Sequence, residues 1–167
     1  MKLNLGCGDK KLAGYVNVDK FGNPDLRIDL NIFPWPWADE SVEEIYSYGY
    51  YEHAIQFMRT WRESYRVLIP NGKLHLIVPH FRSAQTPWPE QHLHQFSIYT
   101  FKYHLMYDFD YSGGKHLFET VHLRHLYGLK LKFLTPLANM CPLAWDWAGL
   151  PVSDIEWTGV KINRKAG

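Results

Sequence analysis

The sequence predicts an α/β domain built on a doubly wound, mostly parallel sheet of seven strands with helices on both faces. Three observations lead to this class: short apolar and β-branched runs recur along the chain, an amphipathic helical segment lies between two of them, and a pair of glycines closes the first run. The chain has 167 residues, which is the usual size of one domain. A single domain over residues 1–167 is therefore expected.

The first three predicted strands are short. They cover residues 2–5, 15–19 and 26–30, and the last two both carry an aspartate at or near their end. Gly6 and Gly8 stop the first strand, because glycine readily takes the positive φ of a tight turn. Few residues then remain before the second strand, so the first crossover helix is expected to be nearly absent.

The other predicted strands alternate with helical sequence. Residues 42–48 and 73–78 have strand patterns, and between them apolar residues fall three or four apart over 55–68, which predicts an amphipathic helix. Residues 121–127 and 155–162 are expected to form the last two strands. Alternation of strands with helices implies parallel pairing.

Residues 81–114 are interpreted as an insertion over the substrate side of the site. The segment is rich in aromatic residues, and a helix is expected over about 98–106, capped by Ser97. Loops on a rigid scaffold often carry specificity. Tyr48 and Tyr50 share one side of an extended segment by their spacing, and Tyr48 is expected to line the acceptor pocket.

The amino-acid composition limits the kinds of partner that the protein is expected to bind. Lys plus Arg (18) nearly balance Asp plus Glu (17), with no run of like charges, so nucleic-acid binding is disfavoured. No stretch reaches about 18 apolar residues, which predicts a cytoplasmic protein without a membrane partner. Cys7 and Cys141 lie far apart and are expected to be free thiols. The many aromatic residues leave a homodimer open.

The turn Gly6-Cys7-Gly8 is a candidate nucleotide-binding turn, although Gly-x-Gly alone is a weak signal. In open parallel sheets ligands bind at the carboxyl ends of the strands, next to strand one. Asp19, which closes the second strand, can accept hydrogen bonds from ribose hydroxyls, or it is simply a solvated strand-end carboxylate. Lys11 stands where a dinucleotide-binding motif needs its third glycine, and Asp19 comes earlier than the usual ~20 residues.

Segments 3–8, 14–19, 29–30 and 52–74 resemble the class I S-adenosylmethionine-dependent methyltransferases of the type 11 group. The most specific part is Glu-x-x-Arg-Val-Leu-x-Pro-x-Gly over residues 63–72. The resemblance covers about the first 80 residues. It implies a Rossmann-like fold, S-adenosylmethionine as cofactor and S-adenosylhomocysteine as product.

The resemblance also implies a cofactor site made by the ends of the first four strands. Gly6, Cys7 and Gly8 would contact the methionine part, Asp19 with the adjacent Lys20 the ribose, Asp29 with Leu30 the adenine, and Tyr48 with Gly49 the amino-acid end.

Three histidines are candidates for the acceptor side of the reaction. Methyl transfer is an in-line displacement, and only a hydroxyl or protonated amine acceptor needs a base. His80, His92 and His94 could take that proton, or they are structural. The pair His92 and His94 shows no evident third ligand, so no metal is expected. Glu52-His53 is interpreted as structural, since Glu also favours a helix start.

The leading functional hypothesis is methyl transfer to a small-molecule or sugar-like acceptor. The alternative is a non-catalytic relative that binds the cofactor or a partner without turnover, because a fold can outlast its activity. A nicotinamide-dependent oxidoreductase is a third possibility, weakened by the missing glycine.

Overall fold

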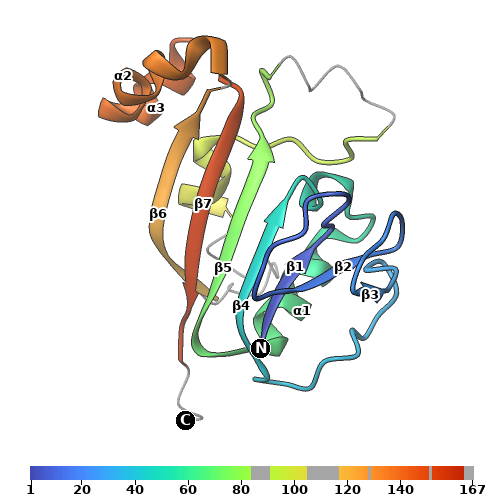
Figure 1. Cartoon of the computed structure of the whole chain (residues 1–167). Helices are drawn as coiled ribbons and strands as arrows, with labels where there is room; N and C mark the ends of the chain where they lie inside the picture. The colour runs from blue at the N-terminus through green and yellow to red at the C-terminus, as the bar shows by residue number, and fades with distance from the viewer. Residues whose placement is uncertain (84–90, 105–116, 128, 151, 164–167) are drawn as a thin grey trace.

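The protein forms one seven-stranded sheet with the strand order β3-β2-β1-β4-β5-β7-β6 (Figure 1). The computed structural model describes residues 1–83, 91–104, 117–127, 129–150 and 152–163. β1 to β5 pair in parallel, and β7 runs antiparallel to both β5 and β6. The predicted class, a mostly parallel α/β sheet, is confirmed. The strands are β1 (Lys2–Leu5), β2 (Val16–Asp19), β3 (Leu26–Arg27), β4 (Val42–Tyr48), β5 (Leu68–Pro79), β6 (Phe118–Leu126) and β7 (Asp154–Lys161).

The helical elements are few and mostly short. They are η1 (Tyr51–His53), α1 (Phe57–Val67), η2 (Thr100–His104), η3 (Leu129–Leu134), α2 (Thr135–Met140) and α3 (Pro142–Trp147). The predicted cap is present, because the Thr100 amide donates to Ser97 Oγ at 3.4 Å. The end of that predicted helix, like the rest of 105–116, lies outside the described residues. Within the described ranges no helix is both long and apolar enough to cross a membrane.

The core lies on one face of the sheet. Trp157 on β7 stacks on Phe101 of η2 at 5.5 Å between ring centroids and packs against Trp61 of α1 at 5.3 Å. On the opposite face, side chains such as His75 and Glu156 are half-buried and pair at 3.0 Å. In the described part of the chain the helical cover of this second face is reduced, because the connections after β1 and β2 contain only turns.

Helix α1 buries a wider stripe than the one that apolar spacing predicts, since Trp61 is buried and Met58 and Tyr65 pack against the core as expected. Its buried side chains include Thr60, Trp61 and Ser64, whereas Ile55 precedes the helix and is 66% exposed. The Ser64 hydroxyl is satisfied internally, since Tyr51 Oη lies 2.6 Å from Ser64 Oγ, which donates to the Thr60 carbonyl. Apolar spacing misses this part of the buried side because a hydrogen-bonded hydroxyl lies in the core.

Candidate functional site

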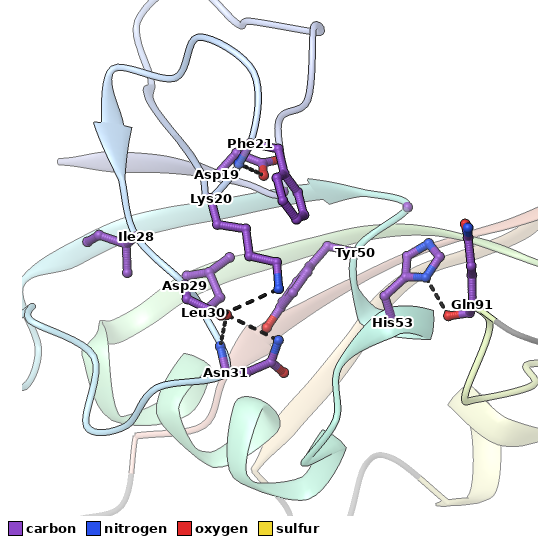
Figure 2. Close-up of a pocket in the computed structure, with 12 residues that line it drawn as sticks. Asp19, Lys20, Phe21, Ile28, Asp29, Leu30, Asn31, Tyr50, His53 and Gln91 are labelled. Carbon is purple, nitrogen blue, oxygen red and sulfur yellow. Dashed lines mark hydrogen bonds and ion pairs between the residues drawn. The ribbon is translucent and has the colours of Figure 1, made fainter.

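A cavity of about 430 Å³ opens at the carboxyl edge of the sheet. β1 lies between β2 and β4, so the cavity sits where the strand order switches, the usual ligand position in open parallel sheets. Its volume is in the range of small-molecule sites. The lining residues are Gly6, Asp19, Lys20, Phe21, Ile28, Asp29, Leu30, Asn31, Gly49, Tyr50, His53 and Gln91 (Figure 2).

Six of the residues assigned to the cofactor line this cavity: Gly6, Asp19, Lys20, Asp29, Leu30 and Gly49. The other three, Cys7, Gly8 and Tyr48, lie outside the lining. Cys7 is buried, and burial raises the pKa of its thiol. The structure therefore brings most of the predicted cofactor residues together at the cavity, whereas Cys7 and Gly8, the second half of the glycine turn, do not line it.

Gly6 makes the turn between β1 and the cavity. Its amide and that of Cys7 both donate to the Val18 carbonyl, at 2.9 and 3.1 Å. With φ at +66°, Gly6 occupies the left-handed region. A Cβ at this position would lie 2.5 Å from Tyr50 Cβ. Glycine is needed here both for its backbone angle and because Tyr50 passes directly over it.

Asp19 joins the ends of the first two strands. Its Oδ2 accepts the Gly8 amide at 2.8 Å, and its Oδ1 accepts the Phe21 amide at 2.9 Å. A carboxylate has about four acceptor positions, so these bonds leave room for ligand hydroxyls. Figure 2 shows the Asp19 carboxylate beside Phe21 at one side of the cavity. Asp19 thus both shapes the turn and presents an acceptor to the cavity.

Lys20, Asp29 and Asn31 form a polar group at another side of the cavity. Asp29 accepts the Asn31 backbone and side-chain amides at 3.0 and 3.2 Å and pairs with Lys20 Nζ at 3.4 Å. These bonds, the Asn31 backbone amide first, lower the pKa of Asp29. Asn31 Oδ1 also accepts the Ile55 amide at 2.9 Å, which ties the segment to the approach to α1.

Tyr50 occupies the middle of the site. Figure 2 shows its ring directed towards Lys20 and Asn31. Its hydroxyl is buried, and burial raises its pKa to about 12, although the Thr60 side chain beside it acts in the opposite direction. The hydroxyl therefore stays neutral at neutral pH.

Tyr48 lies apart from Tyr50 although their spacing suggested a common side. Gly49, at φ +78°, separates them and turns the chain after β4. Lys10 Nζ sits 3.8 Å from the centroid of the Tyr48 ring, outside the cavity lining. Tyr48 therefore does not line this cavity, because period-two alternation ends at a left-handed glycine, and its assignment to the acceptor pocket stays a prediction.

His80 lies in a fully buried network away from the cavity lining. Its Nε2 is 3.1 Å from Asp146 Oδ1, which also lies 2.8 Å from His125 Nε2. The Arg82 amide donates to His80 Nδ1 at 3.2 Å. Burial alone would raise the pKa of Asp146, but hydrogen bonds from His125 and His80 hold it well below its usual range. The network connects β5, β6 and α3.

His92 and His94 come from the described part of the 81–114 segment, which docks on η1. The Leu93 and His94 amides both donate to the Glu52 carbonyl, at 2.8 and 3.2 Å. His94 Nε2 lies 2.7 Å from the Ala54 carbonyl. These main-chain bonds place Gln91 and His92 at the cavity edge, although forty residues of sequence separate them from η1.

A cluster of ionisable side chains results from this docking. Donor atoms of Glu52, His53 and His92 all lie within 4.8 Å of one another. The His53 and His92 ring centroids are 4.9 Å apart, and His53 Nδ1 lies 2.6 Å from the Gln91 carbonyl. Glu52 is 3% exposed, and burial raises its pKa to about 7.

Six lining residues were not predicted: Phe21, Ile28, Asn31, Tyr50, His53 and Gln91. Phe21 and Asn31 adjoin predicted positions, and this proximity was the available signal. His53 and Gln91 carry no such signal, because their contact depends on the docking of distant segments. The described part of the chain contains free cysteines at Cys7 and Cys141, as expected.

Neither the family models nor the curated proteins that were searched match the chain. Solved structures do match over nearly its whole length. A SAM-dependent methyltransferase from Archaeoglobus fulgidus superposes with a TM-score of 0.65 at 12% identity, covering 96% of this chain and 85% of that one. A chain in the complex between the Haloferax volcanii Trm112 methyltransferase activator and a methyltransferase gives 0.61 at 17% identity, covering 97% and 82%.

Geranyl diphosphate methyltransferase in complex with SAM gives a TM-score of 0.61 at 9% identity, covering 96% of this chain and 77% of that one. These similarities establish the fold and not the reaction, because the identities are low. The chain has the Rossmann-like fold of the class I SAM-dependent methyltransferases. Its cavity lies at the strand-order switch of that fold.

Proposed function

We propose that this protein binds S-adenosylmethionine in the cavity and transfers its methyl group to a small-molecule or sugar-like acceptor, leaving S-adenosylhomocysteine. The observation that carries the proposal is the convergence of Gly6, Asp19 and Asp29 on one cavity at the strand-order switch. In this arrangement Gly6 adjoins the methionine part and Asp19 accepts the ribose hydroxyls. Asp29 and Leu30 lie at the adenine.

The turn after β1 favours this cofactor over a dinucleotide. Residues 9–14 form only turns, so no helix N-terminus faces the cavity after β1. A pyrophosphate gains from the positive end of a helix dipole, whereas a sulfonium cation does not. A site without that helix therefore costs S-adenosylmethionine little.

The acceptor is assigned to the end of the cavity lined by His53 and Gln91, next to Gly49 at the amino-acid end of the cofactor. Gln91 belongs to the 81–114 segment, which supports the assignment of that segment to the substrate side. Methyl transfer mainly requires that the nucleophile be held about 3 Å from the methyl carbon and in line with it. Of the candidate histidines, His92 contacts His53 at this end, whereas His80 is buried elsewhere.

Titration calorimetry with S-adenosylmethionine and S-adenosylhomocysteine tests the cofactor, with NAD as the control ligand. Both are expected to bind and NAD is not. Asp19→Asn should weaken binding by about 1 to 3 kcal/mol, because it replaces a charged acceptor by a neutral one. Asp9→Asn removes an exposed carboxyl outside the cavity lining and should leave the affinity unchanged.

Turnover is tested by following S-adenosylhomocysteine formation with a panel of hydroxyl and amine acceptors, sugars included. Product formation that Asp19→Asn lowers would support the proposal. Binding without product from any acceptor class would favour the non-catalytic alternative. Absence of binding by either sulfur compound would overturn the proposal.

A further inference from the structure

Metal-binding side chains from two segments far apart in the sequence meet beside the acceptor end of the cavity. Glu52 and His53 follow β4 in η1, and His92 comes from the docked segment; their donor atoms lie within 4.8 Å of one another. We propose that these three residues bind a divalent transition-metal cation, with Zn²⁺ as the best fit. His53 itself lines the cavity, so a bound cation would adjoin it.

The hydrogen bonding of His53 prepares it to be a ligand. Its Nδ1 lies 2.6 Å from the Gln91 carbonyl, an acceptor that requires the proton to be on Nδ1. Nε2 then carries the free lone pair. A backbone carbonyl holding the non-ligating nitrogen is the usual second partner of a metal-binding histidine, since it sets both tautomer and ring orientation.

Glu52 supplies an oxygen that lacks a partner. Its side chain is 3% exposed, and Oε2 is buried without a hydrogen-bond partner among the described residues. An orphaned buried carboxylate oxygen is costly and calls for a specific explanation, a bound ion being one. A cation between Glu52 and the two imidazoles would satisfy it.

The donor set selects the cation. Two imidazoles and one carboxylate suit zinc and its first-row neighbours, whereas Mg²⁺ and Ca²⁺ prefer oxygen ligands alone. Zinc bonds of about 2.0–2.1 Å require the donor atoms, which lie within 4.8 Å of one another, to move closer together on binding. Three protein ligands leave a fourth position open, as in catalytic zinc sites.

The second cluster with metal-ligand composition, His80, His125 and Asp146, is better explained by hydrogen bonds. The Arg82 amide donates to His80 Nδ1, so Nε2 carries the proton and donates to Asp146. The second Asp146 oxygen accepts the Ile98 amide at 3.0 Å. Both Asp146 oxygens are therefore hydrogen-bonded without a cation, although His125 Nδ1 is buried without a hydrogen-bond partner among the described residues. The cluster serves as the internal comparison.

A cation at Glu52, His53 and His92 would act on the acceptor, and this chemistry rests on the proposed methyl transfer. An acceptor hydroxyl in the open position would lose its proton to solvent more readily, because a metal lowers the pKa of a bound oxygen acid. The oxygen then forms its bond to the methyl carbon as the sulfonium–carbon bond breaks. No oxidant or reductant is involved.

The test begins with protein freed of metal by a chelator. Zn²⁺ is titrated calorimetrically, and Co²⁺ is followed by its visible absorption, which reports coordination geometry. One equivalent should bind, and Mg²⁺ should not compete. His53→Gln, His92→Gln and Glu52→Gln should each weaken Zn²⁺ binding at least about tenfold, by analogy with the 10–100-fold losses seen for supporting residues.

The control His122→Gln removes an exposed histidine on β6 and should keep the wild-type Zn²⁺ affinity. His125→Gln should also keep it if the buried cluster binds no metal. Unchanged affinity in both His53→Gln and His92→Gln, or loss only in His125→Gln, would overturn the proposal. Thermal unfolding of each variant identifies losses of Zn²⁺ affinity that come from misfolding. Glu52→Gln keeps the size of the side chain, so it tests the site even if a histidine variant fails to fold.

S-adenosylmethionine binding separates this proposal from the proposed function. His92 lies outside the cavity lining, so His92→Gln should bind the cofactor as wild type does while losing Zn²⁺. A protein that binds S-adenosylmethionine but no Zn²⁺ would overturn the metal site alone. One that binds Zn²⁺ at these residues but no S-adenosylmethionine would overturn the proposed function alone.

Discussion

Gly6 and Tyr50 lie in direct contact at the cavity: a Cβ on Gly6 would come within 2.5 Å of Tyr50 Cβ. The turn after β1 and the segment after β4 are thereby packed against each other without an intervening side chain. Tyr50 can lie over the turn only because position 6 lacks a side chain. The shape of the cavity floor depends on this pair.

Gly6→Ala is therefore expected to destabilise the protein and to abolish cofactor binding. The alanine would meet Tyr50 and would also occupy the left-handed region at a cost of about 1–2 kcal/mol. Gly8→Ala is the matched control, since Gly8 has φ +49° but no atom within 4 Å of an added Cβ. Urea unfolding and calorimetry should show a clearly larger loss for Gly6→Ala, and equal losses would contradict the role of the Tyr50 contact.

The raised pKa of Asp154 predicts that the stability of the protein depends on pH. Burial raises its pKa to about 6, although nearby Lys10 acts in the opposite direction; Tyr48 and Glu52 are the other titratable groups around it. A carboxyl whose pKa is raised by folding stabilises the protein below its unfolded pKa of about 3.9 and loses that contribution as pH rises through 6.

The expected result is that Asp154→Asn has a higher unfolding midpoint than wild type at pH 8 and no advantage at pH 4. Asp9→Asn, an exposed carboxyl, controls for the loss of one negative charge. Thermal unfolding across pH 4 to 8 measures the difference. A variant curve parallel to that of wild type over the whole range would show that Asp154 does not titrate with folding.

Asp146 is expected to be a major contributor to stability. It is 3% exposed in its side chain and receives hydrogen bonds from His80, His125 and the Ile98 amide. Asp146→Asn should lower the free energy of unfolding by about 3 kcal/mol, the usual cost of breaking a buried charged network. The low pKa of Asp146 means that this stabilisation is present above about pH 4 and is lost as the pH falls further.

Urea unfolding at pH 7 and pH 3 checks this prediction, with Asp9→Asn, an exposed carboxyl, as the control. The difference between Asp146→Asn and wild type should shrink at pH 3. A loss under about 0.5 kcal/mol at pH 7 would place the variant among ordinary surface changes and contradict the prediction.

Arg66 links helix α1 to the loop beside the cavity. Its guanidinium donates to the Trp35 and Trp37 carbonyls at 3.1 and 2.9 Å and pairs with Glu63 at 2.8 Å. Trp35 in turn donates its indole N–H to the Leu30 carbonyl. Arg66→Lys should cost about 1–2 kcal/mol of stability, because lysine lacks the planar fork, and it should also weaken cofactor binding through Leu30.

Guanidinium unfolding and calorimetry measure both effects. Arg62→Lys, at an exposed position of the same helix, is the comparison variant, and it should cost clearly less stability and affinity than Arg66→Lys. If Arg66→Lys lowered stability but left cofactor affinity intact, the loop would not transmit the change to the cavity.

The fold followed from local sequence patterns. Alternating apolar residues predicted β1 and β4 with the bounds that the structure has, and apolar spacing predicted α1 to within two residues at its start. The spacing of apolar residues and the residues that favour turns act over short stretches of chain. They can therefore be recognised in the sequence without knowledge of any tertiary contact. The burial of Ser64 on α1 could not be recognised, because a hydroxyl satisfied by Tyr51 looks polar in the sequence.

By itself the sequence determined the part of the site that adjoins strand ends: Gly6, Asp19 and Asp29 reach the cavity because parallel strands end at a common edge. Only the tertiary structure decided that Tyr50, and not Tyr48, enters the cavity and that His92 meets Glu52 and His53. Those contacts depend on a left-handed turn at Gly49 and on main-chain bonds to the Glu52 carbonyl. Backbone hydrogen bonds between distant segments leave no mark in side-chain spacing, so the chain had to be folded before this cluster could be found.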